Sequence, residues 1–377
     1  MKVVICINTA WNILNFRRGL IEALLKKGHE VIALAPRDEF ADELVRAGCR
    51  FVDMPMPNGG TNPIEDLRLL ARLKSFLRKE RPDVLLTYTA KPNIYGAFAA
   101  RSCGVPVVTN VAGLGAVFIS KSIVTLVVKL LYRWALRSSA RVFFQNQTDR
   151  DLFVRDGMVT MEKTGLLPGS GIDLHRFQPQ PLRSRGGSFR FLLIGRMLRD
   201  KGVTEFVEAA RRLRPRFPNV EFVLLGAADY DNPAAISRVQ IDSWVAEGAV
   251  KYLGTRKDVR EEIASADCVV LPSYREGTPR TLLEAAAMSR PIVTTDAVGC
   301  REVVTDGETG LLCRVADTAD LTEKLEKMLL LTGEQRSSMG KAGRRKMERE
   351  FDERLVVNRY LTTISEITGD TQSVGAA

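Results

Sequence analysis

Short apolar runs alternate with longer amphipathic runs along the whole chain. In the first half, runs typical of buried strands lie near 2–7, 30–34, 51–53, 83–87, 106–109 and 141–144. Runs with helical periodicity lie near 15–27, 38–46, 64–80, 92–103, 120–137 and 147–156. The second half has strand patterns near 189–194, 220–225, 249–252, 268–271 and 291–294, and a last helical run at 353–367. Strands that alternate with helices predict an α/β protein with parallel sheets.

The segment from Leu167 to Gly187 is rich in Pro, Gly and Ser and interrupts this alternation. A chain of 377 residues is long enough for two domains, each with its own core. We therefore predict an N-terminal domain at 1–170 and a C-terminal domain at 171–353.

The composition is that of an ordinary globular protein, with 45% hydrophobic and 27% charged residues. No apolar run reaches the roughly 18 residues of a spanning helix, and the first residues resemble a strand rather than a signal peptide. Six scattered cysteines indicate reduced thiols in a cytosolic protein, and two histidines exclude a His-based metal cluster.

The net charge of +10 is uneven along the chain. Residues 1–180 carry 25 Lys and Arg against 16 Asp and Glu, whereas residues 181–377 carry 30 against 29. A basic first half suits nucleic acid, anionic lipid or an anionic substrate.

Two glutamates flank a turn before a helical run in Ser273-Tyr-Arg-Glu-Gly-Thr-Pro-Arg-Thr-Leu-Leu-Glu284. Pro279 fits a first helical turn, so the backbone N–H groups near Gly277 and Thr278 would form an anion site. Glu276 would precede the helix and Glu284 would lie within it. The alternative is a capped helix with two ordinary surface glutamates.

A second motif follows the apolar run at 191–194, where Gly195-Arg196 precedes Lys201-Gly202 and another helical run. Ligands bind in such turns at the carboxyl ends of parallel strands. Arg196 and Lys201 would offer a guanidinium fork and a point charge to a diphosphate. A basic loop on a solvated surface is the alternative.

Together these motifs resemble the retaining glycosyltransferases of family 4, and the resemblance extends to about Ile367. It implies the GT-B fold, in which two Rossmann-like domains face a central cleft that closes on binding. It also implies that the C-terminal helix, about 354–377, joins the N-terminal domain. The segments Tyr88 to Gly96 and Gly113-Leu-Gly115 resemble bacterial enzymes that add N-acetylhexosamine to polyprenyl-diphosphate-linked sugars.

The resemblance assigns roles to the motif residues. Glu276 would bind the donor sugar and Glu284 the ribose diol, while Arg196 and Lys201 would stabilise the leaving diphosphate. The other expected donor-binding positions are Gly195, Gly277, Thr278, Pro279 and Leu283, with Gly254 and Arg256 near the base. No metal or other cofactor is expected, and Asp229-Tyr-Asp231 is interpreted as a turn despite its D-x-D spacing.

Family resemblance further implies front-face transfer, in which the leaving phosphate helps to deprotonate the acceptor. Many relatives carry a histidine near the donor sugar, and Ala112 stands at the matching position here. Which group in the N-terminal domain replaces this histidine is left open.

The acceptor candidates are Asn12, Phe16, Arg17, Lys91 and Asn93. The first three follow the first strand and would face the cleft, where they could meet an acceptor diphosphate; a solvated helix start is the alternative. Lys91 and Asn93 belong to the segment that resembles the narrower group.

The run from Ser120 to Arg141 is the best candidate for membrane contact. Lys129, Arg133, Arg137 and Arg141 recur every four residues beside a broad apolar surface. This pattern suits a helix lying on an anionic bilayer, or else a core helix with one solvated edge.

We therefore predict a retaining glycosyltransferase, cytoplasmic and peripheral at the inner face of the cell membrane. It would move a sugar, most simply N-acetylhexosamine, from a UDP-sugar to a lipid-diphosphate-linked glycan. The alternatives are a GT-B-type nucleotide-sugar epimerase and a basic nucleic-acid-binding protein; no nucleic-acid motif is visible. The donor sugar, the linkage and the oligomeric state cannot be read from the sequence.

Overall fold

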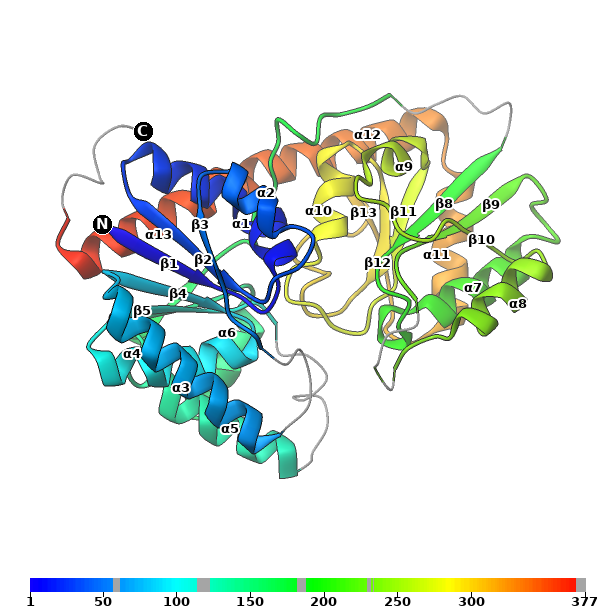
Figure 1. Cartoon of the computed structure of the whole chain (residues 1–377). Coiled ribbons are helices and arrows are strands. Elements are labelled where there is room, and N and C mark those ends of the chain that lie inside the picture. Colours follow the sequence, from blue (N-terminus) through cyan, green and yellow to red (C-terminus); the bar gives the residue numbers. More distant parts are fainter. Residues whose placement is uncertain (57–61, 114–122, 182–187, 229–231, 233, 371–377) are drawn as a thin grey trace. The chain divides into compact units, whose positions relative to one another are not determined.

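The chain divides into two compact units in the computed structural model. Unit 1 comprises Met1–Ser170 and Glu353–Ala377, and unit 2 comprises Gly171–Asp352. The structure describes residues 1–56, 62–113, 123–181, 188–228, 232 and 234–370 (Figure 1). Each unit is built on a parallel sheet, which confirms the predicted fold class.

Unit 1 has a seven-stranded parallel sheet in the order β3-β2-β1-β4-β5-β6-β7. Its strands are β1 (Lys2–Cys6), β2 (Glu30–Ala35), β3 (Arg50–Asp53), β4 (Val84–Tyr88), β5 (Val107–Val111), β6 (Arg141–Phe144) and β7 (Thr164–Leu166). Its helices are α1 (Ala10–Lys26), α2 (Ala41–Arg46), α3 (Pro63–Glu80), α4 (Ala97–Cys103), α5 (Ile123–Leu136), α6 (Gln147–Arg155) and α13 (Glu353–Thr368), with a π-helical turn η1 (Pro92–Gly96) and a 3₁₀ turn η3 (Met161–Lys163).

Helices cover both faces of this sheet, which explains why its central strands are apolar throughout. In β1, Val3 and Ile5 pack with α1, α2 and α13, whereas Val4 and Cys6 pack with α3, α4 and α6. The order of strands reverses between β1 and β4, so loops after these two strands flank the switch point.

Unit 2 has a six-stranded parallel sheet in the order β10-β9-β8-β11-β12-β13. Its strands are β8 (Phe189–Ile194), β9 (Val220–Leu225), β10 (Lys251–Tyr252), β11 (Cys268–Leu271), β12 (Ile292–Thr295) and β13 (Gly310–Cys313). Its helices are α7 (Val203–Leu213), α8 (Arg238–Ala246), α9 (Arg260–Ser265), α10 (Arg280–Ala287), α11 (Thr318–Leu330) and α12 (Gly333–Lys346), with turns η4 (Arg199–Lys201) and η5 (Met347–Phe351). Here the switch point lies between β8 and β11.

Two boundaries differ from the sequence prediction. The first helix begins at Ala10 rather than near residue 15, because the Thr9 side chain accepts a hydrogen bond from the Asn12 N–H at 3.1 Å. The helix α5 ends at Leu136, and the Ala140 N–H donates to the Val107 carbonyl at 2.9 Å as the chain enters β6. Arg141 therefore opens a strand, and the expectation of one helix carrying all four basic residues is wrong.

Among the described residues, no helix combines the length and the apolar character that crossing a bilayer requires. All six cysteines are free thiols, and five of them are buried. Burial raises the pKa of Cys6 and of Cys300 to about 12, so these thiols stay protonated.

Candidate donor and acceptor sites

The two motifs of unit 2 meet at the switch point of its sheet. Lys201 ends the turn after β8, and Glu276 lies in the loop after β11. The Lys201 Nζ donates a hydrogen bond to Glu276 Oε1, and the two side chains are only 17% and 13% exposed. A cation and a carboxylate thus share one half-buried position at the edge where α/β sheets bind ligands.

Backbone contacts hold these two loops together. The Asp200 carbonyl accepts hydrogen bonds from the Tyr274 N–H at 2.9 Å and from the Ser273 hydroxyl at 3.1 Å. Gly202 has a φ of +71°, and a Cβ atom there would lie 2.1 Å from the Pro272 carbonyl oxygen. Only glycine fits this approach, which fixes the position of Lys201 relative to the loop after β11.

The Tyr274 side chain adds a third link. Its phenol donates to Glu205 Oε1 of α7 at 2.5 Å. Burial and the neighbouring Glu205 raise the pKa of Tyr274 to about 12, so the phenol keeps its proton at neutral pH. Sequence reasoning missed Tyr274 because its partner lies 69 positions away.

The loop that carries Glu276 is also tied to the end of β12. The Glu276 N–H donates to the Val298 carbonyl at 2.9 Å. A Cβ atom at Gly299 would lie 2.5 Å from the Glu276 carbonyl oxygen and 2.6 Å from that of Gly277. Pro279 is the N-cap residue of α10, so Gly277 and Thr278 directly precede that helix.

Glu284 lies within α10 and is paired with Arg280, one turn earlier, at 3.2 Å. Arg280 also donates to the Gly171 carbonyl at 3.2 Å. Burial raises the pKa of Glu284, and Arg280 offsets part of that rise. Arg280 was missed from the sequence, although its spacing of four residues from Glu284 is the signal of a helical ion pair.

The remaining donor candidates take different positions. Gly195 follows β8, and a Cβ at the neighbouring Gly226 would lie 1.8 Å from the Gly195 carbonyl oxygen. Gly226 in turn donates to the Gly254 carbonyl at 2.8 Å, so the ends of β8, β9 and β10 lie together. Leu283 is fully buried in the core and supports α10 through packing.

Both candidate arginines of this edge lie in loops. Arg196 is exposed directly after Gly195. Arg256 donates to the Leu253 carbonyl at 2.8 Å, and its Nε lies 3.6 Å from Glu262. The Arg256 guanidinium therefore stabilises the loop in which it lies.

In unit 1, Asn12 and Phe16 lie in the first two turns of α1. The Asn12 Nδ2 donates to Asn8 Oδ1 at 3.3 Å, and the Phe16 ring meets the Trp11 ring edge-on at 5.3 Å. Trp11 is 43% exposed, so this corner presents aromatic and amide groups to solvent.

Arg17 lies on the buried face of α1, which contradicts the expectation that it would face the cleft. It is 5% exposed, and its guanidinium lies 4.1 Å from the centre of the Tyr88 ring. The physical reason is helical periodicity, because residue 17 shares the face of α1 that carries Ile13, Leu20 and Leu24.

Lys91 and Asn93 follow β4, on the other side of the same switch point. Lys91 forms an ion pair with Asp66 of α3 at 2.9 Å. Asn93 is 1% exposed, and its side chain donates to the Asn110 carbonyl at 2.8 Å. This bond links η1 to β5. Ala112 follows β5 and is half-buried.

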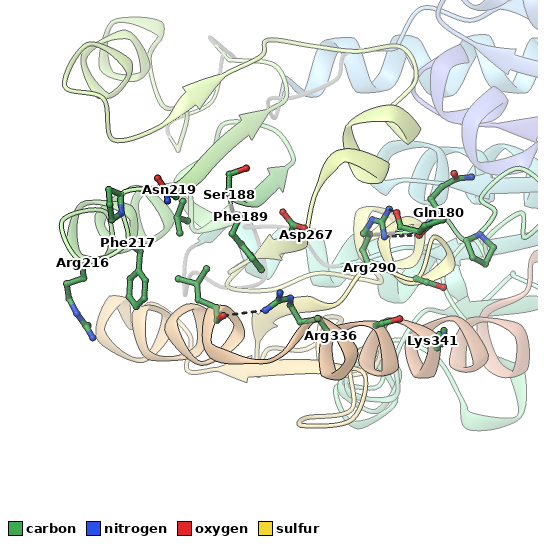
Figure 2. A pocket seen from close by; sticks show the side chains of 18 residues that line it. Gln180, Ser188, Phe189, Arg216, Phe217, Asn219, Asp267, Arg290, Arg336 and Lys341 are labelled. Carbon is green, nitrogen blue, oxygen red and sulfur yellow. Dashed lines mark hydrogen bonds between the residues drawn. The ribbon is translucent and has the colours of Figure 1, made fainter. Parts of the chain in front are cut away.

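A cavity of about 1050 Å³ lies at the amino ends of β8 and β9, at the opposite edge of the unit 2 sheet (Figure 2). Two of the three arginines that line it, Arg290 and Arg336, donate hydrogen bonds to carbonyls at helix ends, and the third, Arg216, is ion-paired with Glu326. Arg290 donates to the Ile263 and Ala264 carbonyls of α9 at 3.0 and 2.9 Å, and Arg336 donates to the Leu329 carbonyl of α11 at 3.3 Å. These bonds satisfy carbonyls that helix C-termini leave unpaired, which is a structural role.

In the described parts of the chain, no three His, Cys, Asp or Glu side chains are grouped so that they could hold a metal ion. Asp229-Tyr-Asp231 and Gly115 lie outside the described residues.

Two family profiles match the chain. Residues 15–169 match the profile described as "Glycosyl transferase 4-like domain", and residues 188–330 match "Glycosyl transferases group 1". The chain is 30% identical to a Campylobacter jejuni N,N'-diacetylbacillosaminyl-diphospho-undecaprenol alpha-1,3-N-acetylgalactosaminyltransferase, over 96% of this chain and 97% of that protein. It is 28% identical to an Escherichia coli UDP-Gal:alpha-D-GlcNAc-diphosphoundecaprenol alpha-1,3-galactosyltransferase, over 75% and 74% of the two proteins.

Solved structures show the same fold at low sequence identity. HepE of Anabaena, in complex with UDP-glucose, has a TM-score of 0.80 at 18% identity and covers 97% of this chain and 100% of that one. Sucrose-phosphate synthase of Thermosynechococcus elongatus has a TM-score of 0.82 at 18% identity, covering 98% and 100%. Both likenesses concern the fold alone.

Proposed function

We propose a donor, an acceptor and a mechanism for this chain, which belongs to the group 1 glycosyl transferases and has the GT-B fold. It transfers an N-acetylhexosamine from a UDP-sugar to a lipid-diphosphate-linked glycan, with retention at the anomeric carbon. Unit 2 binds the donor and unit 1 binds the acceptor.

The observation that carries this proposal is the meeting of Lys201 and Glu276 at the switch point of unit 2. Breaking a sugar–diphosphate bond builds negative charge on the leaving phosphate, and a fixed cation aimed at that charge accelerates the reaction. Lys201, together with Arg196, supplies this charge, while the Glu276 carboxylate accepts hydrogen bonds from sugar hydroxyls. Because these side chains can neutralise the diphosphate, the transfer needs no metal.

Glu284 binds the ribose diol of the nucleotide in this proposal. A carboxylate with two acceptor oxygens suits a vicinal diol, and Arg280 holds the Glu284 carboxylate in place from the same helix. Gly195 and Gly277 carry no side chain that would keep the nucleotide from the backbone, and Thr278 directly precedes the N-cap residue of α10.

The acceptor assignment rests on the relatives. Both curated relatives described above act, by name, on sugars linked to an undecaprenol diphosphate. The basic excess of residues 1–180 suits such an anionic acceptor.

A lipid-linked acceptor places the protein at a membrane, and unit 1 has a surface that fits. On α5, Leu126, Val127, Leu130 and Trp134 are between 47% and 60% exposed. Ile64 and Leu67 of α3 are 63% and 64% exposed, and both helices pack against η1. We name these six residues the apolar surface of unit 1.

Basic groups border this surface. Arg133 and Arg137 are exposed, and the Arg137 guanidinium lies 5.0 Å from the centre of the Trp134 ring. Lys129 is instead paired with Asp156 at 2.8 Å. A large apolar surface with a basic border suits peripheral contact with an anionic bilayer on its cytoplasmic side.

The test is nucleotide release from a panel of UDP- and GDP-sugars, with and without a polyprenyl-diphosphate-linked sugar. Release from one UDP-sugar only when the acceptor is present supports the proposal, and an α-linked product establishes retention. Donor turnover without acceptor would instead indicate an epimerase or a hydrolase.

A further inference from the structure

Asp66 occupies a position of α3 where an apolar side chain is expected. The core face of this helix carries Leu69, Leu73, Phe76 and Leu77, and Asp66 lies one turn before Leu69 on the same face. Asp66 is 9% exposed. A carboxylate at such a position needs partners, because burial of a charge without them is costly.

The turn after β4 provides both partners. The Lys91 Nζ donates to Asp66 Oδ1 at 2.9 Å, and the Tyr95 phenol donates to Asp66 Oδ2 at 2.9 Å. Lys91 and Tyr95 are four residues apart at the helical turn η1, so both reach one carboxylate. Burial and Asp66 raise the pKa of Tyr95 above its usual range, which keeps the phenol protonated as a donor.

Two features show that this turn is more than a packing element. Thr89 has a φ of +65°, a conformation that is strained for a β-branched residue and that occurs at functional sites. The turn also follows β4 at the switch point of the unit 1 sheet, where ligands bind in this class of fold.

Lys91 retains capacity for a ligand. Its side chain is 16% exposed, and in the part of the chain that the structure describes only one of its three N–H donors has a hydrogen-bond partner. A well-packed apolar pair usually stabilises a fold at least as well as a buried ion pair, so stability alone does not account for this arrangement.

We infer that Asp66 is a positioning residue that, with Tyr95, orients the Lys91 ammonium toward the phosphate oxygens of the acceptor. The inference rests on the proposed function, since it takes the acceptor to carry a diphosphate. Asp66 acts through Lys91 and does not contact the acceptor itself.

Binding of farnesyl diphosphate to the full chain, measured by calorimetry with saturating UDP present, tests this inference. UDP occupies the diphosphate site of unit 2, so the probe reports the acceptor site. We expect Lys91→Met and Asp66→Asn each to weaken binding by about tenfold, the loss typical of one charge-assisted hydrogen bond. Tyr95→Phe should weaken it less, and UDP affinity should not change in any of these variants.

Two comparisons separate positioning from a structural role. Asp66→Asn should have no further effect in the Lys91→Met background, because its action passes through Lys91. Glu65→Gln is the matched control, since Glu65 lies beside Asp66 but is paired at the surface with Arg68. It should bind like the wild type.

Other outcomes overturn the inference. Unchanged or tighter binding by Asp66→Asn would show that Asp66 only neutralises Lys91, and equal losses in both backgrounds would show a general structural effect. Farnesyl diphosphate binding that is unchanged in the Lys91→Met variant would also overturn the inference. A wrong assignment of the proposed function would give a different result, because the transfer assay would then show no nucleotide release.

Discussion

Lys201 and Glu276 form a hydrogen-bonded ion pair across 75 positions of the chain. In the proposed function, Lys201 binds the leaving diphosphate and Glu276 binds the sugar, so the pair spans the bond that breaks. Because each side chain is less than a fifth exposed, the ion pair fixes the orientation of both groups at this edge of the unit 2 sheet.

Removing either partner should impair transfer strongly. We expect Glu276→Gln and Lys201→Met each to lower kcat/KM by about 10²–10³, the loss seen when one preorganised charge-stabilising group is removed. The double variant should lose less than the product of the single losses, because both groups act on one bond. Nucleotide-release kinetics measure this, with Asp242→Asn as control, since Asp242 belongs to an exposed ion pair on α8. Near-normal kinetics in Glu276→Gln would contradict the assignment.

Glu284 should make folding stability depend on pH. Its pKa is raised in the folded protein, so it stabilises the fold fully below its unfolded pKa and loses this contribution as pH rises through the folded value. Glu284→Gln removes this titration. We therefore expect the Tm difference, variant minus wild type, to be more positive near about pH 7 than near about pH 4.

Thermal unfolding over that range measures the effect, where 1 kcal/mol corresponds to about 2–4 °C. A Tm difference that does not vary with pH would count against a raised pKa. Loss of UDP-sugar binding in the same variant would support the ribose role.

Gly202→Ala should destabilise unit 2 and displace Lys201. The new Cβ would lie 2.1 Å from the Pro272 carbonyl oxygen, in a left-handed conformation with a φ of +71°. Gly248→Ala is the matched control, because its φ is +76° but its nearest neighbour is an arginine side chain at 3.5 Å. The control should lose about 1 kcal/mol in the free energy of unfolding, and Gly202→Ala clearly more. Equal losses in urea unfolding would show that the close approach is unimportant.

The apolar surface of unit 1 should govern membrane binding. We expect Leu130→Ser with Trp134→Ser to abolish sedimentation with anionic vesicles at low salt, because both exposed side chains would enter the bilayer interface. Val239→Ser is the control for replacing an exposed apolar side chain elsewhere, since Val239 is 79% exposed on α8 of unit 2. A wild-type protein that stays in the supernatant would overturn membrane contact by this surface.

Much of the fold is predictable from local pattern. Buried parallel strands are apolar throughout, so runs such as 189–194 and 220–225 coincide with the observed strands. Helical periodicity also predicts where Arg17 lies, because its spacing from Ile13 and Leu20 places it on the buried face of α1. The expectation that Arg17 would face the cleft did not take this spacing into account.

Other features depended on the tertiary structure. Local motifs alone predict which polar residues follow the strands, including Lys201, Glu276 and Lys91. Only the folded chain decided their partners, since β8 lies beside β11 and α3 beside the turn after β4. Sheet order and helix packing are set by burial summed over many distant residues, so no local spacing reveals that Lys91 meets Asp66 or that Tyr274 meets Glu205.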